Sequence, residues 1–241
     1  MTPLLSTAFC PPIEYFAVLA GYSSVYMEAR ESYVKQSWRN RCRILTANGP
    51  LDSVVPVIHA ASQGNPSSNV SLPLDPTAVA VPPLTLPRVA GFSEGDPLPA
   101  AKLITAVKVE YDTPWVAKFR RAVESAYGNS PYYIYYEDEF WRIFGEKPET
   151  LWELNWKIIE FICTKIGIAP KIEPTKEFGG KGECLDLRDA IHPKRKNKLM
   201  EEMGVGRPYW QVFREKFGFV EGLSALDLLF NEGPESLGYL R

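Results

Sequence analysis

The spacing of hydrophobic residues changes twice within the first thirty positions of this chain. Residues 3–9 form a short apolar run, which predicts a buried strand. After Pro11-Pro12, apolar residues recur at helical spacing from Ile13 to Ala20. Ser23–Ala29 is predicted to be a second strand. A helix of this length between two strands is typical of a crossover that joins parallel strands, so the pattern predicts an α/β fold.

The next segment alternates between basic and apolar residues. If Tyr33–Leu45 is a strand, the two kinds of side chain fall on opposite faces. One face then carries Lys35, Arg39, Arg41 and Arg43, and the other carries Val34, Trp38, Cys42 and Ile44. Asn48-Gly49 predicts a tight turn and Leu51–His59 the returning strand of a hairpin. Pro56 indicates an edge position or a bulge in that strand.

Residues 61–100 differ in composition from the rest of the chain. They hold eight of the 21 prolines but only one of the 30 aromatic residues, which is too little apolar bulk for a packed core. We therefore predict an irregular segment inserted between two strands, the second being Leu103–Tyr111. With this insertion, residues 1–241 form a single domain. The alternative is a linker between two small domains.

The insertion leads to a testable prediction. Replacing residues 63–98 by a short glycine-serine linker is expected to leave folding intact, because the entropic cost of a loop grows only logarithmically with its length. The yield of soluble protein and a thermal melt measure the outcome. Loss of soluble, cooperatively melting protein would show that the segment belongs to the folded core.

Helical spacing dominates the second half of the chain. Thr113-Pro114 predicts a helix start, and Trp115, Phe119, Val123 and Ala126 continue it as an apolar stripe. Further helices are predicted at about residues 132–144 and 149–166, a strand at Lys171–Glu173, and closing helices at Ser224–Asn231 and Pro234–Leu240. The predicted fold class is therefore α/β, with a small mixed sheet, crossover helices and a helical C-terminal half.

Charge and hydropathy narrow the class of protein. Twenty-seven basic and 29 acidic residues give a formal net charge of -2, so no overall positive field exists to hold nucleic acid or an anionic membrane. No apolar stretch reaches the roughly 18 residues that a membrane-spanning helix needs. The first residues lack the basic start of a secretory leader, and Pro11-Pro12 interrupts their apolar run. We therefore expect a soluble protein whose partner is a small molecule.

The cysteines, the histidines and the missing motifs exclude several kinds of site. Four widely spaced cysteines form no CxxC, and two histidines form no HExxH or HxxxH, so we predict neither a metal nor a cofactor. Unpatterned cysteines are typical of a reducing compartment, which favours the cytoplasm. The chain contains no GxGxxG or GxxxxGK[ST], and no GxSxG elbow between a predicted strand and a predicted helix. Dinucleotide oxidoreductases, P-loop ATPases and α/β-hydrolases are therefore disfavoured.

A dense group of polar and aromatic side chains between Glu28 and Arg43 is the strongest candidate for a ligand site. Guanidinium groups bind phosphate or carboxylate at two points, Asn and Gln distinguish hydroxyls, and Trp or Tyr stack on rings. The group is Glu28, Arg30, Glu31, Tyr33, Lys35, Gln36, Trp38, Arg39, Asn40, Arg41 and Arg43. Such a set suits a phosphorylated, glycosylated or nucleotide-like ligand. The alternative is a solvated edge strand whose cations pair with nearby acids.

A second polar group lies near the C-terminal third of the chain. His192 is a candidate general base, and Asp186 or Asp189 is close enough in sequence to orient it. Gly179-Gly180-Lys181-Gly182 has the composition of an anion-binding nest. The alternative for both stretches, and for the basic residues 194–196, is an ordinary exposed turn.

Two runs of residues resemble the WbqC-like protein family. The first combines Pro11-Pro12 and Tyr15-Phe16 with Tyr33, Lys35, Asn40-Arg41 and Val55-Pro56-Val57, and the second extends from Trp115 through Ala126-Tyr127 and Ser130-Pro131 to the aromatics at 132–136. The resemblance covers most of the chain except residues 61–100. It implies a protein similar to those encoded in bacterial O-antigen and surface-polysaccharide gene clusters. By the same resemblance Lys35, Asn40 and Arg41 become ligand-binding candidates, with Tyr15 and Tyr33 beside them.

These observations lead to one functional hypothesis and one alternative. The hypothesis is a transferase-like enzyme that acts on an activated sugar, such as a nucleotide sugar, with acyl or aminoacyl transfer to an amino sugar as the variant to test first. In it, Lys35 and Arg41 hold phosphate, Asn40 and Gln36 bind hydroxyls, Trp38 or Tyr33 covers a ring face, and Glu28 or His192 moves a proton. The alternative is a non-catalytic module that binds glycan intermediates or a partner enzyme.

Overall fold

The computed structural model describes residues 1–58, 103–180, 183–195 and 197–241. Its strands are β1 (Thr2–Ser6), β2 (Ser24–Glu28), β3 (Arg41–Thr46), β4 (Gly49–Val54), β5 (Val57–Ile58), β6 (Lys108–Val109), β7 (Lys171–Pro174) and β8 (Cys184–Asp186). Its helices are α1 (Ile13–Gly21), α2 (Trp115–Tyr127), α3 (Tyr133–Gly145), α4 (Leu151–Ile166), α5 (Leu199–Glu202), α6 (Arg214–Phe217) and α7 (Ala225–Glu232). The 3-10 turns are η1 (Trp38–Asn40), η4 (Ile104–Ala106) and η5 (Gly233–Tyr239).

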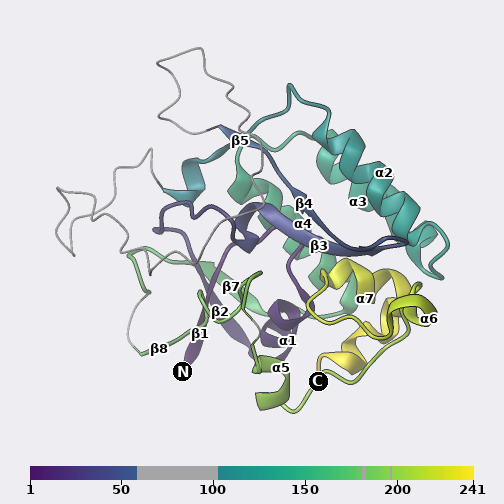
Figure 1. The fold of residues 1–241 in the computed structure, drawn as a ribbon. Coiled ribbons are helices and arrows are strands. Elements are labelled where there is room, and N and C mark those ends of the chain that lie inside the picture. Colours follow the sequence, from purple (N-terminus) through teal and green to yellow (C-terminus); the bar gives the residue numbers. More distant parts are fainter. Residues whose placement is uncertain (59–102, 181–182, 196) are drawn as a thin grey trace, which may run out of the picture.

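A four-stranded parallel sheet has the strand order β7-β2-β1-β8. From β1 the chain continues to β2 and later to β7 on one side, whereas β8 pairs with β1 on the other side. The strand order therefore reverses between β1 and β8, and this is the kind of position where open α/β sheets bind their ligands. Figure 1 shows this sheet and the helices α2 and α3 at opposite sides of the molecule, with the β3-β4 hairpin between them.

The predicted strand, helix and strand at the N-terminus are confirmed. Leu4 and Leu5 in β1 are each 1% exposed, as expected for a central strand covered on both faces. Helix α1 begins directly after Pro12, and its residues 15–20 are all buried, against α5 and α7 among others. Leu4 then lies opposite Tyr26 in the parallel pair of β1 and β2.

The interpretation of Tyr33–Leu45 as one strand is wrong for its first half. The backbone reverses at Gln36, which has a φ of 58°. The Ser37 hydroxyl then accepts a hydrogen bond from the backbone of Arg39 and caps η1. A short hydroxyl side chain that bonds to its own backbone competes with strand pairing, which residue alternation does not reveal. As a result Arg39 is buried in η1. Arg41 belongs to a different element, because β3 begins with it.

The hairpin predicted around Asn48-Gly49 is confirmed as the antiparallel pair β3-β4. Thr46 pairs with Gly49, whose φ of 106° suits a residue without a side chain. The returning strand is shorter than predicted, because the chain leaves β4 at Val54 and passes Pro56 before β5. The strand predicted at 103–111 is likewise reduced to the two residues of β6, preceded by η4. Proline cannot donate a ladder hydrogen bond, which explains the break at 56.

Aromatic side chains fill the core among α2, α3 and the loop after β1. The ring of Phe119 lies 5.3 Å from Phe9 and 5.7 Å from Trp141, and the rings of Phe140 and Trp141 are 4.8 Å apart. Tilted and edge-on pairs of this kind contribute about 0.5 to 1.5 kcal/mol each beyond their buried area. These helices, together with α4 to α7, lie in the C-terminal half of the chain, so the predicted helical C-terminal half is confirmed.

Helix α4 has clear signals at both ends. Thr150 and Glu153 form a capping box at its start, and Gly167 ends it with a φ of 82°. Its buried Asn155 donates hydrogen bonds to the carbonyl of Arg39 at 2.8 Å and to the hydroxyl of Thr7 at 3.2 Å. This helix therefore fixes two loops at the edge of the parallel sheet.

The predicted fold class, α/β, is confirmed, although parallel and antiparallel pairing occur in separate sheets. Strand β8 and the short helices α5 and α6 were not predicted. The whole of the predicted insertion at 61–100, and the end of Leu51–His59, lie outside the described residues, and the single-domain boundary 1–241 stays a prediction. Within the described part of the chain, no helix is both long and apolar enough to span a membrane.

A buried acid in the first turn of α7 makes stability depend on pH. Asp227 is 1% exposed, accepts a hydrogen bond from the Tyr209 hydroxyl, and has its pKa raised by burial to about 6. An unfolded aspartate ionises at about pH 4. Between that pH and about pH 6, the folded protein therefore keeps a proton that the unfolded chain has lost. The contribution of Asp227 to the free energy of unfolding therefore falls as pH rises from about 4 to about 6.

We expect Asp227→Asn to remove this dependence. The free energy of unfolding of the variant, relative to the parent, should rise by about 2 to 3 kcal/mol between pH 4 and pH 7. Denaturant unfolding of both proteins at the two pH values measures the difference. Parallel pH profiles would contradict the assignment of a raised pKa to Asp227.

Candidate functional site

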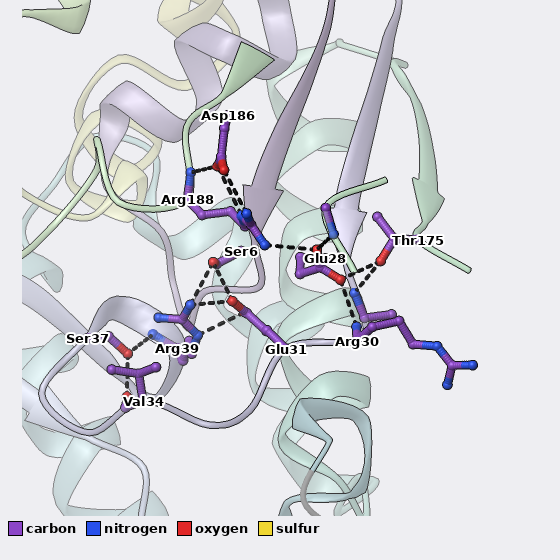
Figure 2. Close-up of polar contacts among 12 residues, drawn as sticks. Ser6, Glu28, Arg30, Glu31, Val34, Ser37, Arg39, Thr175, Asp186 and Arg188 are labelled. Carbon is purple, nitrogen blue, oxygen red and sulfur yellow. Dashed lines mark hydrogen bonds and ion pairs between the residues drawn. The ribbon is translucent and has the colours of Figure 1, made fainter. Parts of the chain in front are cut away.

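Polar side chains gather where the strands of the parallel sheet end. Ser6 ends β1, Glu28 ends β2, Thr175 follows β7 and Asp186 ends β8. Because the carboxyl ends of parallel strands share one edge of a sheet, these residues lie close together, as Figure 2 shows. Two ion-pair networks are built on them.

Glu28 is the centre of the first network. Its carboxylate is fully buried and accepts hydrogen bonds from Arg30 N at 2.8 Å, the Thr175 hydroxyl at 2.6 Å, Gly179 N at 2.7 Å and Arg188 Nη1 at 3.0 Å. An ionised carboxylate offers about four acceptor positions, so these four donors use all of them. Glu28 is therefore placed as an anchor for Arg188. The loop at Gly179 that resembled an anion nest donates to this same carboxylate.

Arg188 is held from two sides. Besides Glu28, its guanidinium contacts both oxygens of Asp186, at 3.0 and 2.6 Å, and its centre lies 4.5 Å from the ring centroid of Phe178. The Arg188 guanidinium lowers the pKa of Asp186. Asp186 is therefore engaged with Arg188 and is not bonded to His192, contrary to one of the sequence alternatives.

Arg39 forms the second network with Glu31 and Ser6. Its Nε donates to Glu31 at 2.9 Å and its Nη2 to the Ser6 hydroxyl at 2.8 Å, while Nη2 also contacts the second oxygen of Glu31. Arg39 and Glu31 are 7% and 6% exposed. The remaining nitrogen, Nη1, has no hydrogen bond to the described residues. A guanidinium fixed in this way keeps a donor for an anionic ligand.

Both arginines line a narrow crevice at the switch point between β1 and β8. Its lining residues, here called the crevice, are Leu5, Ser6, Thr7, Ala8, Tyr15, Ser37, Trp38, Arg39, Leu187, Arg188, Ile191 and His192. They come from the ends of β1 and β8, from α1 and from η1. Positive charge held rigidly at this edge of the sheet is suited to a phosphate or carboxylate group.

A basic groove continues from the crevice. It shares Trp38, Ile191 and His192 with the crevice and adds Pro12, Glu14, Arg43, Pro193, Lys194, Arg195, Asn197, Glu221 and Gly222; these residues are here called the basic groove. The guanidinium of Arg43 lies 5.6 Å from the ring centroid of Trp38. The crevice and the groove together offer cations beside an aromatic surface, a combination suited to a phosphorylated ring compound.

His192 lies where the crevice and the basic groove meet. Partial burial lowers its pKa, and the nearby Arg195 adds to this effect. Its Nδ1 accepts a hydrogen bond from Lys194 N at 3.2 Å, so the neutral ring carries its proton on Nε2. In this arrangement His192 donates a hydrogen bond to a ligand more readily than it accepts a proton.

Of the other predicted site residues, two line the crevice and the rest do not. Tyr15 and Trp38 line the crevice, and the Tyr15 hydroxyl donates to Ser6 O at 3.0 Å. Asn40 is buried and donates to Val55 O at 2.8 Å, which holds the chain beside Pro56.

Tyr33 is half-buried, and burial raises its pKa. Lys35 and Gln36 are exposed, and Gln36 accepts a hydrogen bond from Lys194 at the rim of the groove.

Arg41 lies on the hairpin and is not among the residues that line the crevice or the groove. Its Nη1 is 3.4 Å from Asp52, which also pairs with Arg43 at 2.7 Å. Its Nε is enclosed and has no partner among the described residues. The pair with Asp52 is the one expected for a structural edge strand, so the role of Arg41 in ligand binding stays a prediction.

Arg41→Lys tests that role. From the position of Arg41 we expect the affinity for a sugar phosphate to stay within about twofold and the free energy of unfolding within about 1 kcal/mol, as for other partly exposed ion pairs. Calorimetric titration and a thermal melt measure both. A tenfold loss of affinity with an unchanged melting temperature would return Arg41 to the binding site.

The sequence analysis missed three features of the crevice. Arg39 was included in the candidate group between Glu28 and Arg43 but was given no separate role, and Ser6 and Thr7 were assigned to an apolar run. Arg188, which lies between Asp186 and Asp189, was not singled out. In the structure Ser6 ends β1 and Arg188 follows β8, but the strand predicted at residues 3–9 extended past Ser6 and no strand was predicted at 184–186, so the ends of these strands were not recognised.

The described residues include no group of three or more His, Cys, Asp or Glu side chains arranged to hold a metal ion. Cys10, Cys42 and Cys163 are buried thiols, and burial raises the pKa of Cys163 to about 12. Thiols with raised pKa values are poor nucleophiles.

Fold and site together define a parallel α/β protein with a cationic crevice at its topological switch point. The model of the WbqC-like protein family matches residues 7–77 and 96–204. These ranges cover most of the chain, which therefore belongs to this family. No curated protein and no solved structure matches the chain.

Proposed function

We propose that this protein is a transferase-like enzyme of bacterial surface-polysaccharide assembly that binds an activated, phosphate-bearing sugar in the crevice and the basic groove. The observation that carries the proposal is the pair of guanidinium groups, Arg39 and Arg188, each anchored by a buried carboxylate at the switch point. Anchored guanidinium groups bind phosphate without first losing side-chain freedom. Membership of the WbqC-like family agrees with a sugar substrate.

Each residue then has a role in the proposal. Arg39 donates from Nη1 to the phosphate, His192 donates from Nε2, and Trp38 covers a ring face of the sugar or base. Lys194 and Arg43 in the basic groove neutralise the remaining charge. Acyl or aminoacyl transfer to an amino sugar is the reaction variant we would test first. We expect the protein to work in the cytoplasm, in keeping with its buried thiols.

One observation favours a second candidate, a non-catalytic module that binds glycan intermediates or a partner enzyme. In the described part of the crevice the two nearest carboxylates are already engaged, Glu28 with four donors and Glu31 with Arg39 and Ser6. His192 uses Nδ1 internally. A crevice whose neighbouring acceptors are engaged in this way binds an anion but offers no free general base of its own.

A panel experiment separates the two candidates. The purified protein is incubated with nucleotide sugars, each alone and with an acyl or aminoacyl donor, and both the melting temperature and product formation are followed. A melting shift with product supports the transferase. A melting shift without product from any donor supports the binding module. Absence of any shift across the panel would contradict both.

A further inference from the structure

A cavity of about 370 Å³ adjoins the basic groove. Glu14, Asn197, Glu221 and Gly222 line both the cavity and the groove, so the two spaces adjoin at these residues. A ligand with an anionic group in the basic groove would therefore have its other end next to the cavity. The charged residues that line the crevice are all basic, whereas both acidic and basic residues line the cavity, together with three aromatic rings.

Two carboxylates stand at the junction of groove and cavity. Glu14 lies in the first turn of α1, and its Oε2 is enclosed without a hydrogen-bond partner among the described residues. Within the described ranges, no Lys or Arg forms an ion pair with Glu14 or Glu221. Burial raises the pKa of Glu14, and the neighbouring Glu221 adds to this effect. An enclosed carboxylate of this kind is stabilised by a cation that donates hydrogen bonds to it.

Three aromatic rings also line the cavity. The ring of Tyr209 lies 5.3 Å from Phe219 at an interplanar angle of 89°, and 5.9 Å from Tyr239 at 73°. Ring faces attract cations, and Tyr239 already does so, because the guanidinium of Arg207 lies 4.5 Å from its centroid. Carboxylates beside aromatic rings are suited to an ammonium group.

We propose that this cavity binds the primary ammonium group of the ligand, with Glu14 and Glu221 accepting its hydrogen bonds beside the rings of Tyr209 and Phe219. The ligand class is then an amino sugar, or an aminoacyl group, that also carries phosphate. This inference rests on the proposed function in one respect, namely that the same molecule occupies the basic groove.

A matched pair of sugars tests the proposal. In calorimetric titrations at neutral pH, glucosamine 1-phosphate is expected to bind roughly 10- to 100-fold more tightly than glucose 1-phosphate, the range of charge-assisted hydrogen bonds. Glu14→Gln should bring the two affinities together by weakening only the amino sugar. Glu202→Gln, on α5 but not in the cavity wall, should keep the difference. Glu221→Gln, at an exposed position, provides a second variant should Glu14→Gln melt early.

A second probe separates this proposal from the proposed function. Benzylamine and benzyl alcohol carry no phosphate, and NMR of the aromatic resonances follows their binding. Shifts with benzylamine that vanish in Glu14→Gln support the ammonium site even if neither sugar phosphate binds, an outcome that would contradict the proposed function alone. Equal affinities for the two sugar phosphates, or an amine preference that survives in both Glu14→Gln and Glu221→Gln, would overturn the ammonium site. Binding of an anionic probe such as benzoate in place of benzylamine would assign the cavity to Arg207 and Lys198 instead.

Discussion

Glu28→Gln is expected to destabilise the fold by about 3 to 5 kcal/mol, because it leaves Arg188 without its buried counter-ion and places an amide where four donors converge. In a chain of this length the melting temperature should fall by roughly 10 °C. Thermal and denaturant unfolding measure the effect. Proton transfer by Glu28 stays a prediction, whereas the four donors on its carboxylate are the contacts expected of an anchor.

The control for this experiment is Glu149→Gln. Glu149 also forms an ion pair, with Lys108 at 2.6 Å, but both partners are largely exposed. Its substitution should change the free energy of unfolding by less than about 1 kcal/mol. If Glu28→Gln melted like the parent protein and lost only turnover, Glu28 would be a catalytic residue and the anchoring role would be wrong.

Arg39→Lys is expected to weaken the binding of a sugar phosphate by roughly 10- to 100-fold, corresponding to about 1.5 to 3 kcal/mol. A lysine keeps the charge, but its single nitrogen lacks the planar fork that contacts Glu31 and Ser6 through Nε and Nη2 and directs Nη1 into the crevice. Calorimetric titration below the melting temperature measures the affinity. Arg120→Lys, at an exposed pair with Glu124 on α2, is the matched control and should bind like the parent protein. Equal affinities of Arg39→Lys and the parent would remove Arg39 from the site.

Local patterns predicted the elements whose signals are local. The apolar run of β1 and the helical spacing of α1 and α4 are local patterns, and all three elements formed as expected. The same reasoning failed at Arg39, because the turn at Gln36 and the hydroxyl cap of Ser37 override the alternation of the sequence.

The candidate site depends on contacts that no local pattern contains. Glu28 and Arg188 are 160 positions apart, and they meet because β8 pairs with β1 on the side away from β2. β8 has three residues and a charged sequence, too short for a periodic signal. Once the strand order is known, the carboxyl ends of β1 and β8 identify the crevice directly. Tyr15, Trp38 and His192 were predicted as site residues and line it.

A crystal structure of the protein with a bound nucleotide sugar tests the central claim most directly. The account predicts phosphate density within hydrogen-bond distance of Arg39 Nη1 and His192 Nε2, between the ends of β1 and β8. Phosphate density on the β3-β4 hairpin at Arg41, with none in the crevice, would contradict it.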